Sequence, residues 1–200
     1  MTIVTYPSDV LSQRAEKVTA FDESLRTIAQ QMFQTMVDGQ GVGLAAPQVG
    51  LSIQLCVIHI PEDPHGEVAL VNPEIVHAEG RQTGEEGCLS FPGIFIDVQR
   101  AMRVRVRYQD LDGQPQEIEG EGLLARALQH EIDHLHGVLL VNKMTTIQRL
   151  ANRRSLEMLR RRTASAPQEA AEAAQATAPG WQADLSGLPE GRLIARRDDP

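Results

Sequence analysis

The stretch Gln129-His130-Glu131-Ile132-Asp133-His134-Leu135-His136-Gly137 contains the pattern His-Glu-x-x-His. Residues four apart lie on one face of a helix, about one turn apart, so two imidazoles at this spacing can converge on one metal ion. A carboxylate directly after the first histidine flanks that ion and can take a proton from water. The stretch therefore predicts a metal-binding helix and indicates metal-assisted hydrolysis.

The residues around this stretch predict a helix that is buried nearly all round. An apolar face with helical spacing lies between Gly122 and Gly137 and consists of Leu124, Leu128, Ile132 and Leu135. A rotation of about 100° per residue places His130 about 200° from Leu128, across the helix from that face. Leu123 and Ala127 share the histidine side. Two unpaired imidazoles on a buried face would be costly, which favours a metal site over a chance match.

The composition predicts one globular domain with an appendage. The chain has 200 residues, of which 42% are hydrophobic, and a formal net charge of -8. Residues 145–162 are the exception, with six arginines and one glutamate. An acidic body with one basic segment argues against DNA as a partner but allows a local anion-binding patch.

No stretch approaches the ~20 apolar residues that span a bilayer, so we expect no membrane association. Met1 to Val10 lack a basic region followed by an apolar run, the pattern of an export signal. Two sparse cysteines, Cys56 and Cys88, are more typical of thiols or metal ligands than of a disulfide. We therefore expect a cytoplasmic protein, with Cys56 as a core thiol.

Alternating and helical patterns elsewhere predict the remaining elements. Asp22 caps an amphipathic helix that ends at Gly39. Strands are predicted over residues 52–60, 68–77, 95–109 and 114–119, the last two joined by a hairpin turn. Asn72-Pro73 interrupts the second of them, which implies an edge strand or a bend. Thr145 or Thr146 caps a last helix with an apolar side formed by Ile147, Leu150, Leu156, Met158 and Leu159. From Thr163 the composition predicts a flexible tail, which divides the chain into a domain at 1–162 and a tail at 163–200.

Two loops combine small residues with reactive ones. Residues 41–48 read Gly-Val-Gly-Leu-Ala-Ala-Pro-Gln, which lets the backbone approach a neighbouring group closely. Residues 85–93 place Cys88 among turn-forming residues. Cys88 can be the third ligand beside the two histidines, a buried thiol or a nucleophile, and the loop alone does not choose among these.

Three motifs in this order resemble the peptide deformylases, which remove the formyl group from the initiator methionine of nascent bacterial proteins. They are Gly41 to Gln48, Glu86 to Ser90, and Gln129 to His134. The resemblance covers roughly residues 1–162. It implies an α+β fold in which antiparallel sheets surround a central metal-binding helix, followed by a C-terminal helix.

The resemblance also implies a role for each site residue. The metal ligands are Cys88, His130 and His134. The metal is usually Fe2+, with Ni2+, Co2+ or Zn2+ as substitutes. Glu131 is the general base and then the acid, while the side-chain amide of Gln48 and the backbone N–H of Leu89 donate hydrogen bonds to the formyl oxygen.

Substrate contacts and partners follow from the same resemblance. The substrate-binding residues are Val42, Gly43, Gly87, Arg126 and Leu128, with the methionine side chain near Val42, Arg126, Leu128 and His130. Arg126 replaces the apolar residue of some members, and Glu86 with Arg100 is expected to form an ion pair behind Cys88. The partners are N-formylmethionyl nascent peptides and, through residues 145–162, the ribosome near its exit tunnel.

Two alternatives share the His-Glu-x-x-His pattern. A zinc endopeptidase would take a later histidine or glutamate as its third ligand, whereas Cys88 lies upstream in its own motif. A non-catalytic structural zinc site would be closed by a fourth protein ligand, for which Cys56 or His136 is available. A glutamate at position 131 has no purpose in the structural site.

Overall fold

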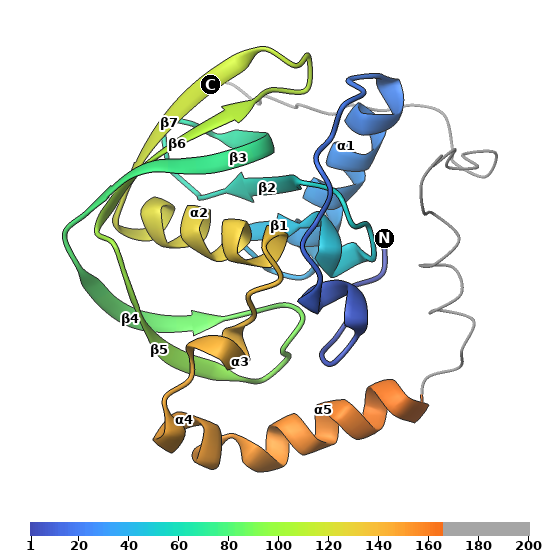
Figure 1. The fold of residues 1–200 in the computed structure, drawn as a ribbon, viewed down its shortest axis with the longest axis vertical. Helices are drawn as coiled ribbons and strands as arrows, with labels where there is room; N and C mark the ends of the chain where they lie inside the picture. Colours follow the sequence, from blue (N-terminus) through green and yellow to red (C-terminus); the bar gives the residue numbers. More distant parts are fainter. Residues whose placement is uncertain (166–200) are drawn as a thin grey trace, which may run out of the picture.

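The helix α2 (Gly122–Leu135) lies between two antiparallel sheets in the computed structural model, which describes residues 1–165. The larger sheet has the order β1-β2-β3-β6-β7 and consists of Gly43–Ala45, Leu55–His59, Glu67–Glu79, Arg103–Gln109 and Pro115–Glu121. The smaller sheet pairs β4 (Gln82–Gly87) with β5 (Phe95–Arg100). Figure 1 shows α2 in the space between them. The predicted α+β class, with sheets around a central helix, is confirmed.

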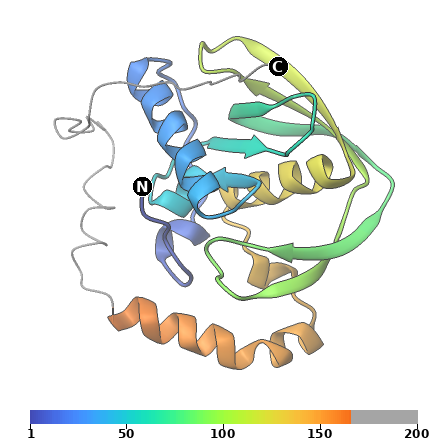
Figure 2. The ribbon, with the colours of Figure 1, turned by 180° about the vertical axis from the view of Figure 1, so that it is seen from behind.

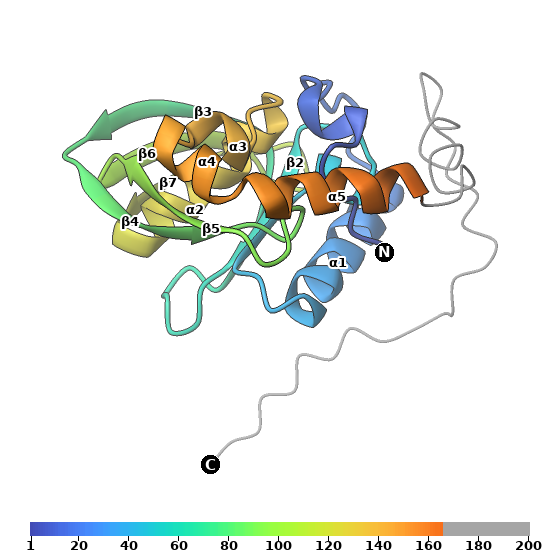
Figure 3. The same cartoon turned by 90° about the horizontal axis from the view of Figure 1, so that it is seen from below.

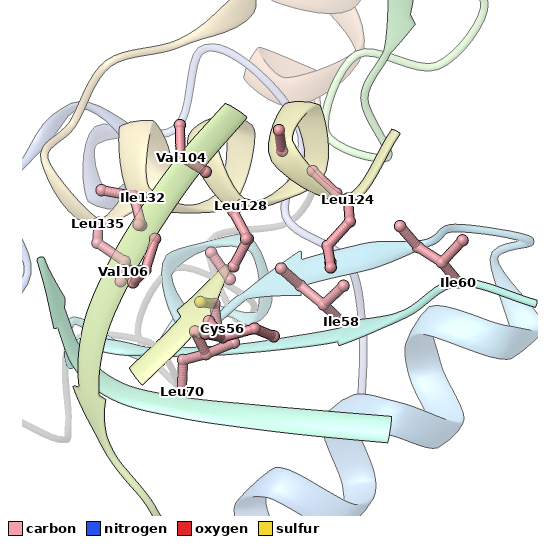
Figure 4. Packing of buried hydrophobic residues seen from close by; sticks show 14 of the residues in the cluster. Cys56, Ile58, Ile60, Leu70, Val104, Val106, Leu124, Leu128, Ile132 and Leu135 are labelled. Carbon is pink, nitrogen blue, oxygen red and sulfur yellow. The ribbon is translucent and has the colours of Figure 1, made fainter. Parts of the chain in front are cut away.

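The apolar face of α2 packs onto the larger sheet. Figure 4 shows Leu124, Leu128, Ile132 and Leu135 on the side of the helix that faces Cys56, Ile58 and Leu70, with Val104 and Val106 on the strand that passes beside it. Each fully buried leucine or isoleucine contributes about 1.5–3 kcal/mol to folding. The opposite side of α2 carries the histidines, and there Ala127 is buried but Leu123 is 53% exposed. The prediction of burial nearly all round is therefore wrong at Leu123.

The helix α1 (Glu23–Asp38) covers the other face of the larger sheet (Figure 2). Its first turn is capped as predicted, because the Asp22 carboxylate accepts a hydrogen bond from the N–H of Leu25 at 3.1 Å. Successive side chains of β2 point to opposite faces of the larger sheet, one face toward α1 and the other toward α2. Leu55 and Val57 pack toward α1, whereas Cys56 and Ile58 pack toward α2.

Short helical segments and a longer C-terminal helix complete the described chain. They are η1 (Asp9–Ser12), η2 (Ala46–Val49), α3 (Leu140–Lys143), α4 (Thr146–Ala151) and α5 (Arg153–Ser165). The hydroxyl of Thr145 caps α4. The helix is interrupted at Asn152, so the single last helix that was predicted is two helices, α4 and α5. Figure 3 shows α5 crossing one side of the molecule. Among residues 1–165, no helix is long and apolar enough to cross a membrane.

Two strand predictions need correction. The segment 95–109 is two strands in different sheets, because Ala101 between them exchanges hydrogen bonds with the side chain of Gln129 on α2 (N to Oε1 3.0 Å, Nε2 to O 3.1 Å). The strand β4 was not predicted, and its last residues, 85–87, lie in the segment expected to form turns; it is polar and contains Gly84 and Gly87. The bend at Asn72-Pro73 is confirmed as a register shift within β3, with Asn72 at φ 51°. The predicted tail at 163–200 lies outside the described residues, apart from 163–165 in α5.

Candidate metal centre

The three predicted ligands converge at one point between α2 and the end of β4. One donor atom of each of Cys88, His130 and His134 lies within 4.8 Å of the other two. Sγ of Cys88 is 3.3 Å from Nε2 of His134, and the imidazole rings of His130 and His134 have centroids 5.0 Å apart. A thiolate with two imidazoles suits a divalent transition metal, and three protein ligands leave a position open for water or substrate. The donor set therefore fits a catalytic metal.

Glu86 orients the first histidine. Its Oε2 lies 3.0 Å from Nδ1 of His130, which leaves Nε2 of that ring for a metal. The predicted ion pair with Arg100 is present, with Nε and Nη2 at 2.9 and 3.0 Å from the carboxylate. Burial raises the pKa of Glu86, but hydrogen bonds from His130 and Arg100 outweigh it and lower the pKa to about 2. Glu86 is therefore an ionised acceptor.

Glu131 lies beside the ligands, and the surroundings of its carboxylate raise its pKa. The residue is 4% exposed, and Oε2 makes no hydrogen bond within residues 1–165. Burial raises the pKa of Glu131 to about 7, against the opposing effect of His130. A carboxyl group with a pKa near neutrality can accept a proton and return it within one reaction.

The small residues after Gly41 make room for that carboxylate. A Cβ placed on Gly43 would lie 2.4 Å from Oε1 of Glu131, a separation that side chains do not adopt. The loop was predicted to let its backbone lie close to a neighbouring group, and that group is the side chain of Glu131, which lies against Gly43 of β1. Since β1 forms an edge of the larger sheet, its backbone has one side without a neighbouring strand among residues 1–165.

The side-chain amide of Gln48 faces the metal ligands. The N–H of Ala45 donates to Oε1 of Gln48 at 2.8 Å, which fixes the amide so that Nε2 points at Sγ of Cys88, 3.4 Å away. The backbone N–H of Leu89 donates to no other described residue. The Gln48 amide therefore lies beside a metal ligand, where it can donate to negative charge on a bound oxygen.

The structure separates the five predicted substrate-binding residues. Val42 is 37% exposed next to Gly43, and Gly87 is exposed at the end of β4, beside the ring of Phe95. Leu128 is fully buried against the larger sheet, as its rotation from His130 requires, and its expected contact with the methionine side chain stays a prediction. Arg126 is 8% exposed and hydrogen-bonded to Glu86 and to backbone carbonyls, and its contact with substrate also stays a prediction.

Neither candidate for a fourth protein ligand joins the site. Cys56 and His136 lie outside the ligand group found in residues 1–165. Burial, together with the charge of Glu131, raises the pKa of the Cys56 thiol, so Cys56 is a core thiol as predicted. His136 caps the C-terminus of α2. A closed structural zinc site is therefore not supported.

Asp133 and Lys143, for which no role was predicted, extend the ion pair of Glu86 and Arg100 toward the surface. Arg100 donates to Asp133 through Nη1, and Nζ of Lys143 lies 2.9 Å from Oδ2 of Asp133. Asp133 stands between Glu131 and His134 in the motif, which was the available signal. The partners come from β5 and α3, so only the fold identifies them.

Comparisons with known proteins agree with this site. The sequence model of the family described as polypeptide deformylase matches residues 1–150. A peptide deformylase of Acidobacterium capsulatum is 52% identical over 161 residues, which cover 79% of this chain and 95% of that protein. Peptide deformylase 1 of Bacillus anthracis is 50% identical over 145 residues, covering 72% and 92%. The crystal structure of a peptide deformylase from Legionella pneumophila superposes with a TM-score of 0.75 at 48% identity, covering 83% of this chain and 98% of that one. The chain therefore belongs to the peptide deformylase family.

Proposed function

We propose that this chain removes the N-formyl group of nascent peptides with Glu131 as the proton carrier. The observation that carries the assignment is the buried Glu131 carboxylate beside a Cys-His-His ligand set, with the Gln48 amide aimed at Cys88. A divalent ion in this set supplies Lewis acidity, which lowers the pKa of water and polarises a carbonyl.

The side chains divide the chemical steps among them. Glu131 takes a proton from water as the water oxygen bonds to the formyl carbon. Nε2 of Gln48 and the N–H of Leu89 donate to the formyl oxygen as it gains negative charge. Glu131 then protonates the departing amine as the C–N bond breaks. The products are formate and a peptide with a free N-terminal methionine.

The peptide is proposed to bind along the open edge of β1, near Gly43 and Gly87. Backbone pairing of this kind is largely independent of sequence, which suits an enzyme that acts on many chains. Val42 and Phe95 are exposed apolar side chains beside these glycines, and we assign the methionine contact to this region.

The test is formate release from an N-formylmethionyl tripeptide by the parent and by Glu131→Gln. We expect the variant to keep its metal and lose about 10²–10⁴-fold in kcat, the usual contribution of general acid–base catalysis. Glu117→Gln, on the exposed face of β7, is the matched control and should match the parent. Mass spectrometry that finds cleaved peptide bonds would favour the endopeptidase alternative. No formate with any divalent metal would reject both the activity and the mechanism.

We propose Fe2+ as the metal, with Ni2+, Co2+ or Zn2+ as substitutes. Thiolate and imidazole ligands accept all four ions. Anaerobic purification with metal analysis tests the assignment. We expect iron in the isolated protein and activity that falls on exposure to air. A protein that contains zinc and is fully active in air would contradict the iron assignment.

We also propose a cytoplasmic location, where nascent chains are made, and docking of α4 and α5 at the ribosome. Residues 145–162 carry six arginines and one glutamate, and Arg153 and Arg154 are exposed. Such a surface suits contact with ribosomal RNA. Because α5 packs on the body through Leu156 and Leu159, charge reversal is a cleaner test than deletion.

In the docking test, Arg153→Glu combined with Arg154→Glu should weaken co-sedimentation with ribosomes and leave activity on a free tripeptide unchanged. The control reverses Arg103 and Arg105 on β6, and we expect it to co-sediment like the parent. Parental, salt-insensitive co-sedimentation of the α5 variant would reject the docking surface.

A further inference from the structure

We infer that Arg126 is a positioning residue that fastens together the two parts of the fold that supply the metal ligands. The inference rests on the metal site described above. His130 and His134 belong to α2, whereas Cys88 directly follows β4 of the smaller sheet. Within residues 1–165 the two sheets share no strand, so contacts across α2 determine where the Cys88 thiol lies relative to the imidazoles.

The guanidinium of Arg126 bonds both strands of the smaller sheet from its place on α2. Nη1 lies 3.2 Å from the carbonyl oxygen of Gly84 on β4 and 3.0 Å from that of Val98 on β5. Gly84 and Val98 are direct partners in the register of the two strands. A single side chain of the metal-binding helix therefore holds the hairpin at one defined pair of residues.

The same nitrogen lies 2.7 Å from Oε1 of Glu86, and this contact links Arg126 to a metal ligand. Oε1 accepts from Arg126 and from Nε of Arg100, while Oε2 interacts with Nη2 of Arg100 and with Nδ1 of His130. An ionised carboxylate has about four acceptor positions, so all of them are used. Loss of Arg126 opens one position and lets the carboxylate turn away from His130.

Arginine has properties here that other residues lack. Its planar fork presents several donors in fixed directions, whereas a lysine ammonium acts as a point charge on a flexible stem. Glycine at position 84 leaves the necessary space, because a Cβ there would lie 3.1 Å from Nη2 of Arg126. Arg126 also precedes His130 by one helical turn, so both side chains meet Glu86 from the same face of α2.

A purely structural arginine would stabilise the fold without affecting the metal. The two roles differ in what a substitution changes in protein that is still folded. Loss of a positioning contact alters the affinity and the coordination of the metal well below the unfolding temperature. Loss of a structural contact lowers the unfolding temperature and leaves the affinity of the remaining folded protein unchanged.

The experiment compares Co2+ binding by the parent, Arg126→Met and Arg126→Lys. Each protein is stripped of metal and titrated with Co2+ against a chelator, and the cobalt absorption bands are recorded. We expect Arg126→Met to lower the affinity by about 10–100-fold, as is typical of residues that support metal ligands, and to shift the bands. Arg126→Lys should recover part of the loss. Arg107→Met removes an arginine from an exposed pair with Glu117 and should bind Co2+ like the parent.

Parental affinity and spectrum in Arg126→Met would overturn the inference, even if its unfolding temperature falls. If Arg126→Met does not fold, Arg126→Lys decides, because the flexible lysine stem does not fix the direction of its donors as the planar guanidinium does. Parental Co2+ binding by that variant would then reject the role. Failure of the proposed activity gives a different result: the parent would bind Co2+ but would release no formate.

Discussion

Gly43 lies against the carboxylate of Glu131 so closely that a Cβ at position 43 would come within 2.4 Å of Oε1. We predict that Gly43→Ala displaces this carboxylate and lowers kcat by roughly 100-fold, since displacement of a catalytic group by about 1 Å has an effect of that size. The backbone at position 43, which we propose to pair with the substrate, is retained. Formate release from a formylated tripeptide, measured at saturating substrate, gives kcat.

Gly66→Ala is the control for this substitution. A Cβ at Gly66 meets nothing within 4 Å, although its φ of +63° makes alanine unfavourable. We expect a small loss of stability and parental kcat. Parental kcat in Gly43→Ala as well would show that the Glu131 carboxylate moves aside without consequence.

Gln48 and Gln54 are both buried, at 2% and 6% exposure, but only the first faces the metal ligands. We predict that Gln48→Ala lowers kcat by about 10²–10³-fold, the usual effect of losing one donor to a developing oxyanion. Nε2 of Gln54 instead donates to the carbonyl of Ala15 at 3.1 Å. Gln54→Ala should lower the free energy of unfolding and leave kcat unchanged. Equal kcat in the two variants would remove Gln48 from the mechanism.

Local patterns predicted the elements whose determinants are local. The helix α1 follows from its apolar spacing and its Asp22 cap, and α2 follows from the same kind of spacing. The strand β4 was missed because its buried residue is Glu86, which is accommodated only by Arg100 and Arg126 from distant parts of the chain. The break at Ala101 likewise depends on Gln129, 28 residues away, and side-chain alternation continues across it.

The metal ligands could be predicted because a motif fixes the spacing of the residues that bind the ion. The residues whose role depends on the direction of a side chain could be predicted less well. The convergence of Cys88 on the two histidines followed from the resemblance and is confirmed. Leu128 was assigned to the substrate pocket by that resemblance, although helical rotation placed it on the far side from His130. The structure follows the rotation. Arg126 could not be placed from sequence because its acceptors lie on β4 and β5.

Arg100 pairs with Glu86 in the interior and with Asp133, whose side chain is 23% exposed, so its removal leaves the buried Glu86 carboxylate without its two-pronged partner. We predict that Arg100→Ala lowers the free energy of unfolding by about 3–5 kcal/mol, as expected when one member of a buried ion pair is lost. Arg103 forms similar pairs with Glu79 and Glu121, but its side chain is 59% exposed. Arg103→Ala should cost no more than about 1 kcal/mol. Urea denaturation measures both, and equal losses would contradict the role of burial.

The apolar side predicted for the last helix is only partly used for packing. Leu156 is 5% exposed and packs with Phe91 and Leu140 in the core beneath α5, whereas Leu150 on α4 is 70% exposed. We predict that Leu156→Ala lowers the free energy of unfolding by about 2–5 kcal/mol through loss of burial and the cavity it leaves. Leu150→Ser removes little buried area and should change it by less than about 0.5 kcal/mol. Urea denaturation of the metal-loaded protein tests both. A large loss in Leu150→Ser would mean that α4 packs against the body more closely than its exposure indicates, because an exposed side chain has little apolar contact to lose.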